Sequence, residues 1–417
     1  MSRSIASTFG LLGASALLGL GSAAAALEWP EFRGPTGQGI SPATNAPVHW
    51  SAESNIAWKV DLANGWSSPV ISAGKIYLTT STQTGDAISL HALCLDSLDG
   101  RSVWDVELFR PATAEAKKIH SKNSLASPTP IVRAGRVYVH FGHMGTAALD
   151  LSGKVLWKQT DIKYSPVHGN GGSPTLVGDL LIFGCDGVSN PFLAALDANT
   201  GAIRWKTPRN TPARSQFSFC TPLLIEVDAG RELISPASGF VGAYNPADGR
   251  ELWRVRYGEG YSVVPRPVYA GGLLFLSSGF DRPVIYAINP KGAQGDATDT
   301  HVAWTATKGA PTTPSPLVIG DKLYLVSDGG IASCFDAGTG KMHWSERLGG
   351  GFSASPVAAE GRIYFQNESG VGYVMKAGTK YELLAKNDLG ERSLASPAIL
   401  DNCIFIRTES HLWRIGK

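Results

Sequence analysis

Short apolar runs separated by turn residues recur along the whole chain. In the stretch 173–206 they occupy positions 173–177, 180–184, 192–196 and 202–206, with Gly178-Asp179 and Asp197 to Gly201 in the turns. Runs of this length, bounded by Gly, Asn and Asp, are typical of β-strands joined by tight turns. The pattern predicts four short antiparallel strands in this unit of the chain.

The start of this unit occurs eight times as Ser-Pro, or a close variant, followed by an apolar strand. The spacing between successive copies runs from 40 residues, between Ser315 and Ser355, to 59 residues, between Ser68 and Ser127. Repeats of this length that consist of short strands predict an array of similar supersecondary units. The eight copies are Ser68-Pro69, Ser127-Pro128, Ser173-Pro174, Thr221-Pro222, Arg266-Pro267, Ser315-Pro316, Ser355-Pro356 and Ser396-Pro397.

A second repeated phrase is an Asp-x-x-x-Gly turn that leads into a strand with a Trp, as in Asp197 to Trp205. We expect each Trp to pack against the next unit and to bury on the order of 200 Å², while the Asp and Gly shape the turn. Residues 381–386 take the place of the eighth Trp strand. The other fourth strands carry Trp58, Trp104, Trp157, Trp205, Trp253, Trp304 and Trp344.

These counts predict an all-β fold, an eight-bladed β-propeller with four antiparallel strands in each blade. The final repeat ends at Leu412-Trp413 after three strands, whereas the Trp58 strand precedes the first Ser-Pro. We therefore expect residues 56–62 to supply the outer strand of the last blade and to close the ring. The predicted organisation is a signal peptide at 1–26, an N-terminal extension at 27–55 and the propeller at 56–417.

The first residues have the pattern of an export signal. Arg3 is followed by an apolar core at 5–20 and by the small residues Ala24 to Ala26, which favour cleavage near Ala26. The apolar core is short and rich in Gly and Ala, so no membrane span is expected in the mature chain. We predict a periplasmic or secreted protein and expect it to be a monomer.

Charge and cysteine content narrow the expected partners and chemistry. The formal net charge is +2 and 17% of residues are charged, so nucleic acid is not an expected partner. The five cysteines fall in different repeats, and we expect them to be small, free core residues. Cys185 and Cys220 lie in neighbouring repeats and remain the one candidate disulfide. The other three cysteines are Cys94, Cys334 and Cys403.

The turn-and-Trp phrase resembles the docking motif of the quinoprotein-type propeller family, Ala-x-Asp-x-x-Thr-Gly-x-x-x-Trp. Ala195 to Trp205 matches this motif, and Cys334 to Trp344 matches it closely. The start Trp29 to Pro35, followed by Gly37-Gln38-Gly39, resembles exported propellers described as PQQ-binding-like. The resemblance covers residues 29–417, and the wider group includes quinone-dependent alcohol dehydrogenases and BamB-type outer-membrane assembly lipoproteins.

Two departures from the family bear on function. The chain has no adjacent Cys pair, which the dehydrogenases carry beside the cofactor, and no Cys near residue 27, which a BamB-type lipoprotein would carry. We expect an exported, non-catalytic propeller that binds a small molecule, a glycan or an envelope protein, with no cofactor established. The alternatives that the resemblance implies are a PQQ-dependent dehydrogenase of an alcohol or sugar, with Ca²⁺, and a BamB-type scaffold.

The expected binding site is the mouth of the central channel. The loops that lead into each first strand, and those that join the second and third strands, share one face, here called the upper face. The turns of the opposite, lower face are plain hairpins. The segment 109–123 is longer than a blade junction requires and is expected to cover the mouth. The residues predicted to bind a ligand there are Trp66, Lys122, Asn123, Asn170, Gln216, Arg266, Arg282 and Arg392.

Candidate metal and catalytic residues lie in the same loops. His120, His143 and His168 fall in one predicted sector and would suit zinc or another transition metal. The alternative is that each imidazole separately hydrogen-bonds to loop backbone. Asp281 and Asp328 are the candidates for a catalytic base if the protein is a dehydrogenase.

Overall fold

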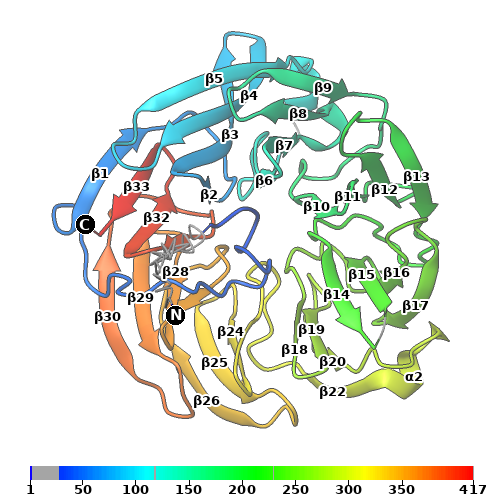
Figure 1. The fold of residues 1–417 in the computed structure, drawn as a ribbon. Coiled ribbons are helices and arrows are strands. Elements are labelled where there is room, and N and C mark those ends of the chain that lie inside the picture. Colours follow the sequence, from blue (N-terminus) through cyan, green and yellow to red (C-terminus); the bar gives the residue numbers. More distant parts are fainter. Residues whose placement is uncertain (2–27, 117–118, 229, 417) are drawn as a thin grey trace.

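Eight four-stranded units surround a central axis in the computed structural model, which describes residues 1, 28–116, 119–228 and 230–416 (Figure 1). Apart from Met1, the predicted signal peptide lies outside these residues. Seven sheets have four antiparallel strands and one has a fifth, parallel strand at its edge. The predicted all-β, eight-bladed propeller is confirmed. None of the described helices is long and apolar enough to cross a membrane.

Blades 1 to 4 follow one another along the chain, and in each the first strand is innermost. Blade 1 contains β2 (Val70–Ser72), β3 (Lys75–Thr84), β4 (Ala87–Asp96) and β5 (Ser102–Phe109). Blade 2 contains β6 (Ile131–Arg133), β7 (Arg136–His140), β8 (Thr146–Asp150) and β9 (Val155–Gln159). Blade 3 contains β10 (Thr175–Val177), β11 (Leu180–Cys185), β12 (Phe192–Asp197) and β13 (Ile203–Pro208). Blade 4 contains β14 (Leu223–Val227), β15 (Gly230–Ala237), β16 (Phe240–Tyr244), β17 (Glu251–Arg256) and the added β21 (Gly295–Asp296).

Blades 5 to 8 complete the ring. Blade 5 contains β18 (Val268–Ala270), β19 (Leu273–Ser277), β20 (Ile285–Ile288) and β22 (Val302–Ala306), with α2 (Thr298–His301) before the last strand. Blade 6 contains β23 (Leu317–Ile319), β24 (Lys322–Val326), β25 (Ile331–Asp336) and β26 (Met342–Arg347). Blade 7 contains β27 (Val357–Ala359), β28 (Arg362–Gln366), β29 (Val371–Lys376) and β30 (Leu383–Asp388). Blade 8 contains β31 (Ala398–Leu400), β32 (Cys403–Arg407), β33 (His411–Ile415) and β1 (Ile56–Asp61).

The ring is closed by β1, which forms the outer strand of blade 8. It pairs antiparallel with β33, and Lys59 lies opposite Trp413. Figure 1 shows the two ends of the propeller, in blue and red, side by side at this blade. The predicted closure is confirmed. It ties residues more than 350 positions apart into one sheet, since Ile56 pairs with Ile415.

The recurring Trp side chains pack between blades, as the sequence predicted. The indole of Trp157, for example, donates from Nε1 to Ala198 O of the next blade at 3.0 Å. It also covers Gly201, where φ is +74° and a Cβ would lie 2.6 Å from the ring. The blade 4 side chain differs: Trp253 is fully buried, its strand β17 pairs with the added strand β21, and its indole donates to Glu232 Oε2 at 2.8 Å. All five cysteines are buried and free, so Cys185 and Cys220 do not form a disulfide.

Residues 28–41, here called the N-terminal plug, cross the lower end of the channel (Figure 1). Arg33 is 1% exposed and donates to Pro316 O at 2.7 Å. Burial, and then the nearby Arg266 guanidinium, lower the pKa of Arg33. The plug contacts the inner strands of several blades. Two of these contacts are isolated β-bridges, Trp29 with Ile71 and Ile40 with Ala358. Two are hydrogen bonds, from Val132 N–H to Pro30 O and from Tyr269 N–H to the Gln38 side chain.

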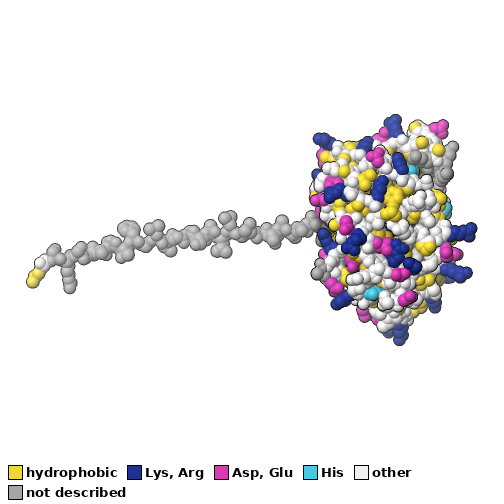
Figure 2. Space-filling view, turned by 90° about the vertical axis from the view of Figure 1, so that its right-hand side faces the viewer, with side chains coloured by type: hydrophobic (Ala, Val, Ile, Leu, Met, Phe, Trp, Pro, Cys, Tyr) yellow, Lys and Arg dark blue, Asp and Glu magenta, His cyan; other side chains and the backbone are white. Residues whose placement is uncertain are grey.

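On the side of the ring drawn in Figure 2, Lys and Arg side chains are interspersed with Asp and Glu. The described residues on this side form no continuous patch of one sign. Such a surface gives no electrostatic footprint for a phosphate backbone there.

Candidate functional site

A ring of hydroxyl groups surrounds the channel at the start of the inner strands. In six of the seven blades that carry such a hydroxyl, the backbone N–H of this residue donates to the side-chain oxygen of the equivalent residue in the next blade. We call this set the hydroxyl ring. Its bonds run from Ser68 to Thr129 (3.0 Å), Thr129 to Ser173 (2.9 Å), Ser173 to Thr221 (2.9 Å), Ser315 to Ser355 (3.0 Å), Ser355 to Ser396 (2.9 Å) and Ser396 back to Ser68 (3.2 Å).

The ring corrects the sequence-based alignment of blade 2. Its ring residue is Thr129, which precedes Pro130 and β6, rather than Ser127. Ser127 lies two residues earlier, where its hydroxyl bonds with that of Ser124 at 2.9 Å. The repeated Ser-Pro phrase thus serves a structural purpose: its hydroxyl accepts from the neighbouring blade, and its Pro needs no partner for a backbone N–H.

Blade 5 interrupts the ring because Arg266 has no hydroxyl. The Arg266 N–H donates to Ser315 Oγ at 3.0 Å, but the guanidinium turns to the plug. It donates to Phe32 O at 2.7 Å and lies 3.1 Å from Glu31 Oε1. Arg266 is 2% exposed and does not line the cavity described next, so its side chain belongs to the channel floor.

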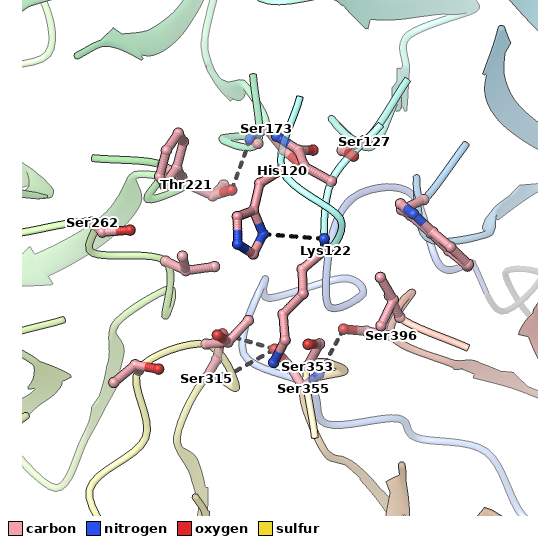
Figure 3. A pocket seen from close by; sticks show the side chains of 18 of the residues that line it. His120, Lys122, Ser127, Ser173, Thr221, Ser262, Ser315, Ser353, Ser355 and Ser396 are labelled. Carbon is pink, nitrogen blue, oxygen red and sulfur yellow. Dashed lines mark hydrogen bonds between the residues drawn. The ribbon is translucent and has the colours of Figure 1, made fainter. Parts of the chain in front are cut away.

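A cavity of about 460 Å³ lies above the plug, in the upper half of the channel (Figure 3). All seven hydroxyls of the ring line it, and Phe32 of the plug contributes to its floor. Of the residues predicted to bind ligand, Trp66, Lys122 and Asn123 line the cavity. His120, His168 and Asp328 line it as well.

One wall of the cavity is aromatic. Phe217 lies in the loop before β14, and its ring centre is 5.4 Å from that of Tyr261 and 5.5 Å from that of His168. Tyr261 in turn lies 5.7 Å from Phe280, which is 53% exposed. Phe219 adds a further ring beside Phe217 at 5.9 Å. Trp66 lines the cavity too, and the Arg392 guanidinium stacks on its ring at 5.6 Å.

Residues 120–123, here called the strap, cross the mouth of the cavity. At one end, Asn123 Nδ2 donates to His168 O at 2.9 Å. At the other, Lys122 Nζ lies 2.7 Å from Glu368 Oε1 of blade 7, and Arg392 donates to Ser121 O at 2.7 Å. In Figure 3 the Lys122 side chain extends across the cavity towards Ser353 and Ser355, and His120 points inward. The strap joins loops on opposite sides of the mouth.

The three candidate metal-binding histidines do not lie together. His120 and His168 are neighbours at the mouth, with ring centres 5.2 Å apart, and burial and His120 lower the pKa of His168. His143 instead lines a second cavity with Asn170, whose amide lies 3.2 Å from His143 Nδ1. Within the described residues no group of three or more His, Cys, Asp or Glu side chains is arranged to hold a metal ion.

The other candidates are spread around the upper face. Asp328 Oδ2 accepts from the N–H groups of Thr312 at 2.6 Å and Thr313 at 3.3 Å, which fixes the carboxylate at the cavity wall. Asp281 and Arg282 are exposed and do not line the cavity. Gln216 is half-buried outside it. The lining also includes residues that the sequence did not single out as site residues: the ring hydroxyls themselves, Phe32, Phe217, Phe219 and Phe280.

Comparison with known proteins identifies the family. The PQQ_2 family, described as outer membrane protein assembly factor BamB, matches residues 48–222 and 284–411. The chain belongs to this family. A search of curated proteins found no match.

Solved structures share the fold of this PQQ_2 member at low sequence identity. BamB from Moraxella catarrhalis is 12% identical with a TM-score of 0.59, covering 87% of this chain and 98% of that one. A europium-containing methanol dehydrogenase is 11% identical with a TM-score of 0.59, covering 94% and 98%. The computationally designed Ika8 protein is 12% identical with a TM-score of 0.57, covering 85% and 98%. These likenesses support the propeller fold alone.

The residues of the cavity do not fit PQQ with Ca²⁺. PQQ is a planar quinone with several carboxylates, so its site needs cations and its Ca²⁺ needs several oxygen ligands. Lys122 is the one Lys or Arg among the described lining residues, and Glu368 already neutralises it. Asp328 is the one lining carboxylate, and two backbone N–H groups already bind its Oδ2. Arg266, which could have paired with a carboxylate, faces the plug.

Proposed function

We propose that this PQQ_2-family propeller is a binding protein that holds a small ligand in the cavity at its upper face. The observation that carries the proposal is a cavity that lies between the N-terminal plug and the upper-face loops. The plug closes the lower end, Phe32 forms part of the floor, and exposed side chains such as Phe280 edge the mouth. A cavity of about 460 Å³ is within the size range of small-molecule sites.

The cavity lining supports binding more directly than catalysis. Asp328 already accepts two backbone hydrogen bonds, and Asp281, the other candidate base, lies outside the cavity. A general base has to lie within hydrogen-bond reach of the proton it removes. The lining is instead rich in hydroxyls and aromatic rings, which are groups that recognise and orient ligands.

The proposal is tested by the small molecules that the protein retains. Wild-type protein, isolated from the cell envelope under native conditions, would be denatured and its small-molecule fraction analysed by mass spectrometry. Thr313→Trp fills the cavity from a half-buried position in its wall. Thr379→Trp is the matched control, because Thr379 is exposed in the β29–β30 turn of the lower face.

We expect a compound that accompanies the wild type and the Thr379→Trp control in a fixed ratio to protein and that is lost from Thr313→Trp. Equal retention by all three proteins would overturn the proposal. The proposal would also be overturned if the wild type retains no compound and, in equilibrium dialysis against an envelope extract, removes no small molecule from that extract.

A second candidate function is a scaffold in envelope assembly, which the family description favours. Its occupant would be a protein segment that contacts the exposed aromatic edge at Phe280. A photo-crosslinking residue in place of Phe280 tests this function. One specific crosslinked envelope protein, absent when the same residue replaces Leu151, supports it; identical products from both positions contradict it. Leu151 is an exposed apolar residue in the β8–β9 turn of the lower face.

We further propose that the protein is exported. Support comes from the pattern of Arg3, the apolar core at 5–20 and the small residues that end at Ala26. The N-terminal sequence of the mature protein tests this proposal. A periplasmic or secreted form that begins near Leu27 is expected, whereas an intact Met1 in a cytoplasmic fraction contradicts it.

A further inference from the structure

We propose that the ligand of the central cavity is a neutral saccharide, bound with one face on the aromatic wall and its hydroxyls on the hydroxyl ring. This inference rests on the proposed function and names the chemical class of its ligand. Three properties of the lining carry it: its charge, the unused hydrogen-bonding capacity of the ring, and the position of the aromatic side chains.

The one Lys that lines the cavity is already paired with a carboxylate, and the one lining carboxylate already accepts hydrogen bonds. The Lys122 ammonium is 2.7 Å from Glu368, and the Asp328 carboxylate is fixed by the N–H groups of Thr312 and Thr313. Arg266 is paired with Glu31 below the floor. An anionic ligand would find no uncompensated Lys or Arg among the described lining residues, and burying an unpaired charge is costly. The lining therefore disfavours an anionic ligand.

The hydroxyl ring offers groups that both donate and accept. A hydroxyl has one proton and two lone pairs, and each ring oxygen uses a lone pair for the N–H of the neighbouring blade. Ser355 donates its proton to Ser315 Oγ at 2.9 Å. The other six, within the described residues, donate to no protein acceptor: Ser68, Thr129, Ser173, Thr221, Ser315 and Ser396.

A ligand with many hydroxyls matches this ring better than other polar classes. Carboxylates and phosphates only accept, and ammonium groups only donate, whereas a sugar hydroxyl does both. Each sugar hydroxyl can thus accept a ring proton and donate to a free lone pair of another ring oxygen. A buried polar group without such a partner costs about 1–3 kcal/mol, so the ring disfavours a purely apolar occupant.

The aromatic wall supplies the second half of the match. Phe217, Phe219 and Tyr261 line the cavity on one side and Trp66 lines it elsewhere. Flat rings at these positions can cover the C–H face of a pyranose while its equatorial hydroxyls reach past the ring edge. The combination of a flat apolar wall and a polyhydroxyl ring is the complement of a sugar, which has both kinds of surface.

The test uses saturation-transfer NMR with the full chain and a panel of neutral mono- and disaccharides, including glucose, N-acetylglucosamine, maltose and cellobiose. Cyclohexanol and gluconate are the comparison probes, because the first has one hydroxyl and the second is an anionic polyol. We expect at least one neutral saccharide to bind more tightly than either probe. Its saturation is expected to be strongest on the C–H protons of one face.

Variants locate the site of binding. Tyr261→Ala is expected to raise the Kd of that saccharide roughly tenfold, while Tyr261→Phe keeps it within about threefold, because the ring and not the hydroxyl makes the contact. Thr129→Val removes one ring hydroxyl at nearly constant volume and is also expected to weaken binding. Unchanged affinity in Tyr261→Ala and Thr129→Val would overturn the inference.

The outcomes separate this inference from the proposed function. If Thr313→Trp loses a retained compound that mass spectrometry identifies as something other than a saccharide, the binding function stands and the saccharide assignment falls. If the panel binds no better than cyclohexanol or gluconate, the assignment falls as well. If a saccharide binds equally to the wild type and Thr313→Trp, both the assignment and the proposed cavity fail.

Discussion

Arg266 Nη1 lies 3.1 Å from Glu31 Oε1, and this contact joins the hydroxyl ring to the N-terminal plug. Both residues are buried, with exposed fractions of 2% and 7%. Arg266 occupies the one ring position that lacks a hydroxyl, and its guanidinium instead binds the segment that closes the channel. The floor of the candidate site therefore depends on an ion pair between residues 235 positions apart.

Breaking this pair is expected to destabilise the protein strongly. Glu31→Gln leaves the buried Arg266 guanidinium without its carboxylate, and removal of one partner of a buried pair typically costs about 3–5 kcal/mol. Urea unfolding measures the loss in the free energy of unfolding. The matched control is Glu107→Gln in the exposed pair with Arg110, where less than about 1 kcal/mol is expected. Equal effects of the two substitutions would show that the plug contact does not stabilise the fold.

Each hydrogen bond of the hydroxyl ring is expected to make its own contribution to the free energy of unfolding. Ser396→Ala removes the acceptor of the buried Ser355 N–H, and an unsatisfied buried donor costs about 1–3 kcal/mol. The free energy of unfolding should fall by that amount, whereas Ser54→Ala on the surface should change it by less than about 0.5 kcal/mol. A neutral result for Ser396→Ala would mean that water replaces the lost oxygen.

The inter-blade Trp contact at the closing blade gives a third prediction. Gly100 has φ +74°, and a Cβ there would lie 2.7 Å from Val60 and 3.0 Å from the Trp58 ring. Gly85 has φ +59° with no heavy atom within 4 Å of its Cβ position. Gly85→Ala should therefore cost only the positive-φ strain of about 1–2 kcal/mol. Gly100→Ala should cost measurably more in thermal or urea unfolding, because Trp58 and β1 have to shift; equal costs would contradict the closing role of this contact.

Buried His140 predicts a loss of stability in acid. Burial, followed by the charge of His143, lowers the pKa of His140 to about 3, while its unfolded value is about 6.5. Above pH 6.5 the imidazole is neutral in both the folded and the unfolded state, so it does not lower the free energy of unfolding there. As the pH falls from 6.5 towards 3, the unfolded state binds the proton first and stability decreases.

Between pH 7 and pH 5 this single group should cost about 2 kcal/mol, at 1.36 kcal/mol for each pH unit below 6.5. His140→Asn removes the titrating ring and should flatten that part of the stability profile, although the variant loses the Nδ1 contact with Thr146 at all pH values. A wild-type profile that is flat from pH 7 to pH 5 would contradict the assignment.

The fold could be predicted from the sequence because each blade repeats the same local chemistry. The Ser-Pro phrase marks the inner strand and the Trp marks the outer one, so the count of blades and the closing strand followed from the pattern. The error at blade 2 has a specific cause. Ser127-Pro128-Thr129-Pro130 offers two hydroxyl-Pro pairs two residues apart, and only the hydrogen bond from Ser68 selects Thr129.

The candidate site could be predicted only in part, because loop position does not give side-chain direction. Trp66, Lys122 and Asn123 do line the cavity, whereas Arg266 starts from an equivalent loop and turns to the plug. The direction of the Arg266 side chain depends on Glu31. The location of Glu31 below the channel follows from contacts between distant residues, which no local sequence pattern reveals. The ring hydroxyls were visible in the sequence as repeats, but their shared direction towards the axis requires the closed ring.

Occupation of the cavity above the plug by a ligand can be measured by protection of a cysteine placed in the cavity wall. The five native cysteines are buried, so Thr313→Cys in the cavity wall and Thr379→Cys on the lower face would be the accessible thiols among the described residues. Each variant would be labelled with a small maleimide with and without the small-molecule fraction of the cell envelope. We predict that the fraction slows labelling at Thr313→Cys and leaves Thr379→Cys unchanged. Equal labelling rates at Thr313→Cys with and without the fraction, while that fraction binds the protein in dialysis, would contradict occupation of the cavity.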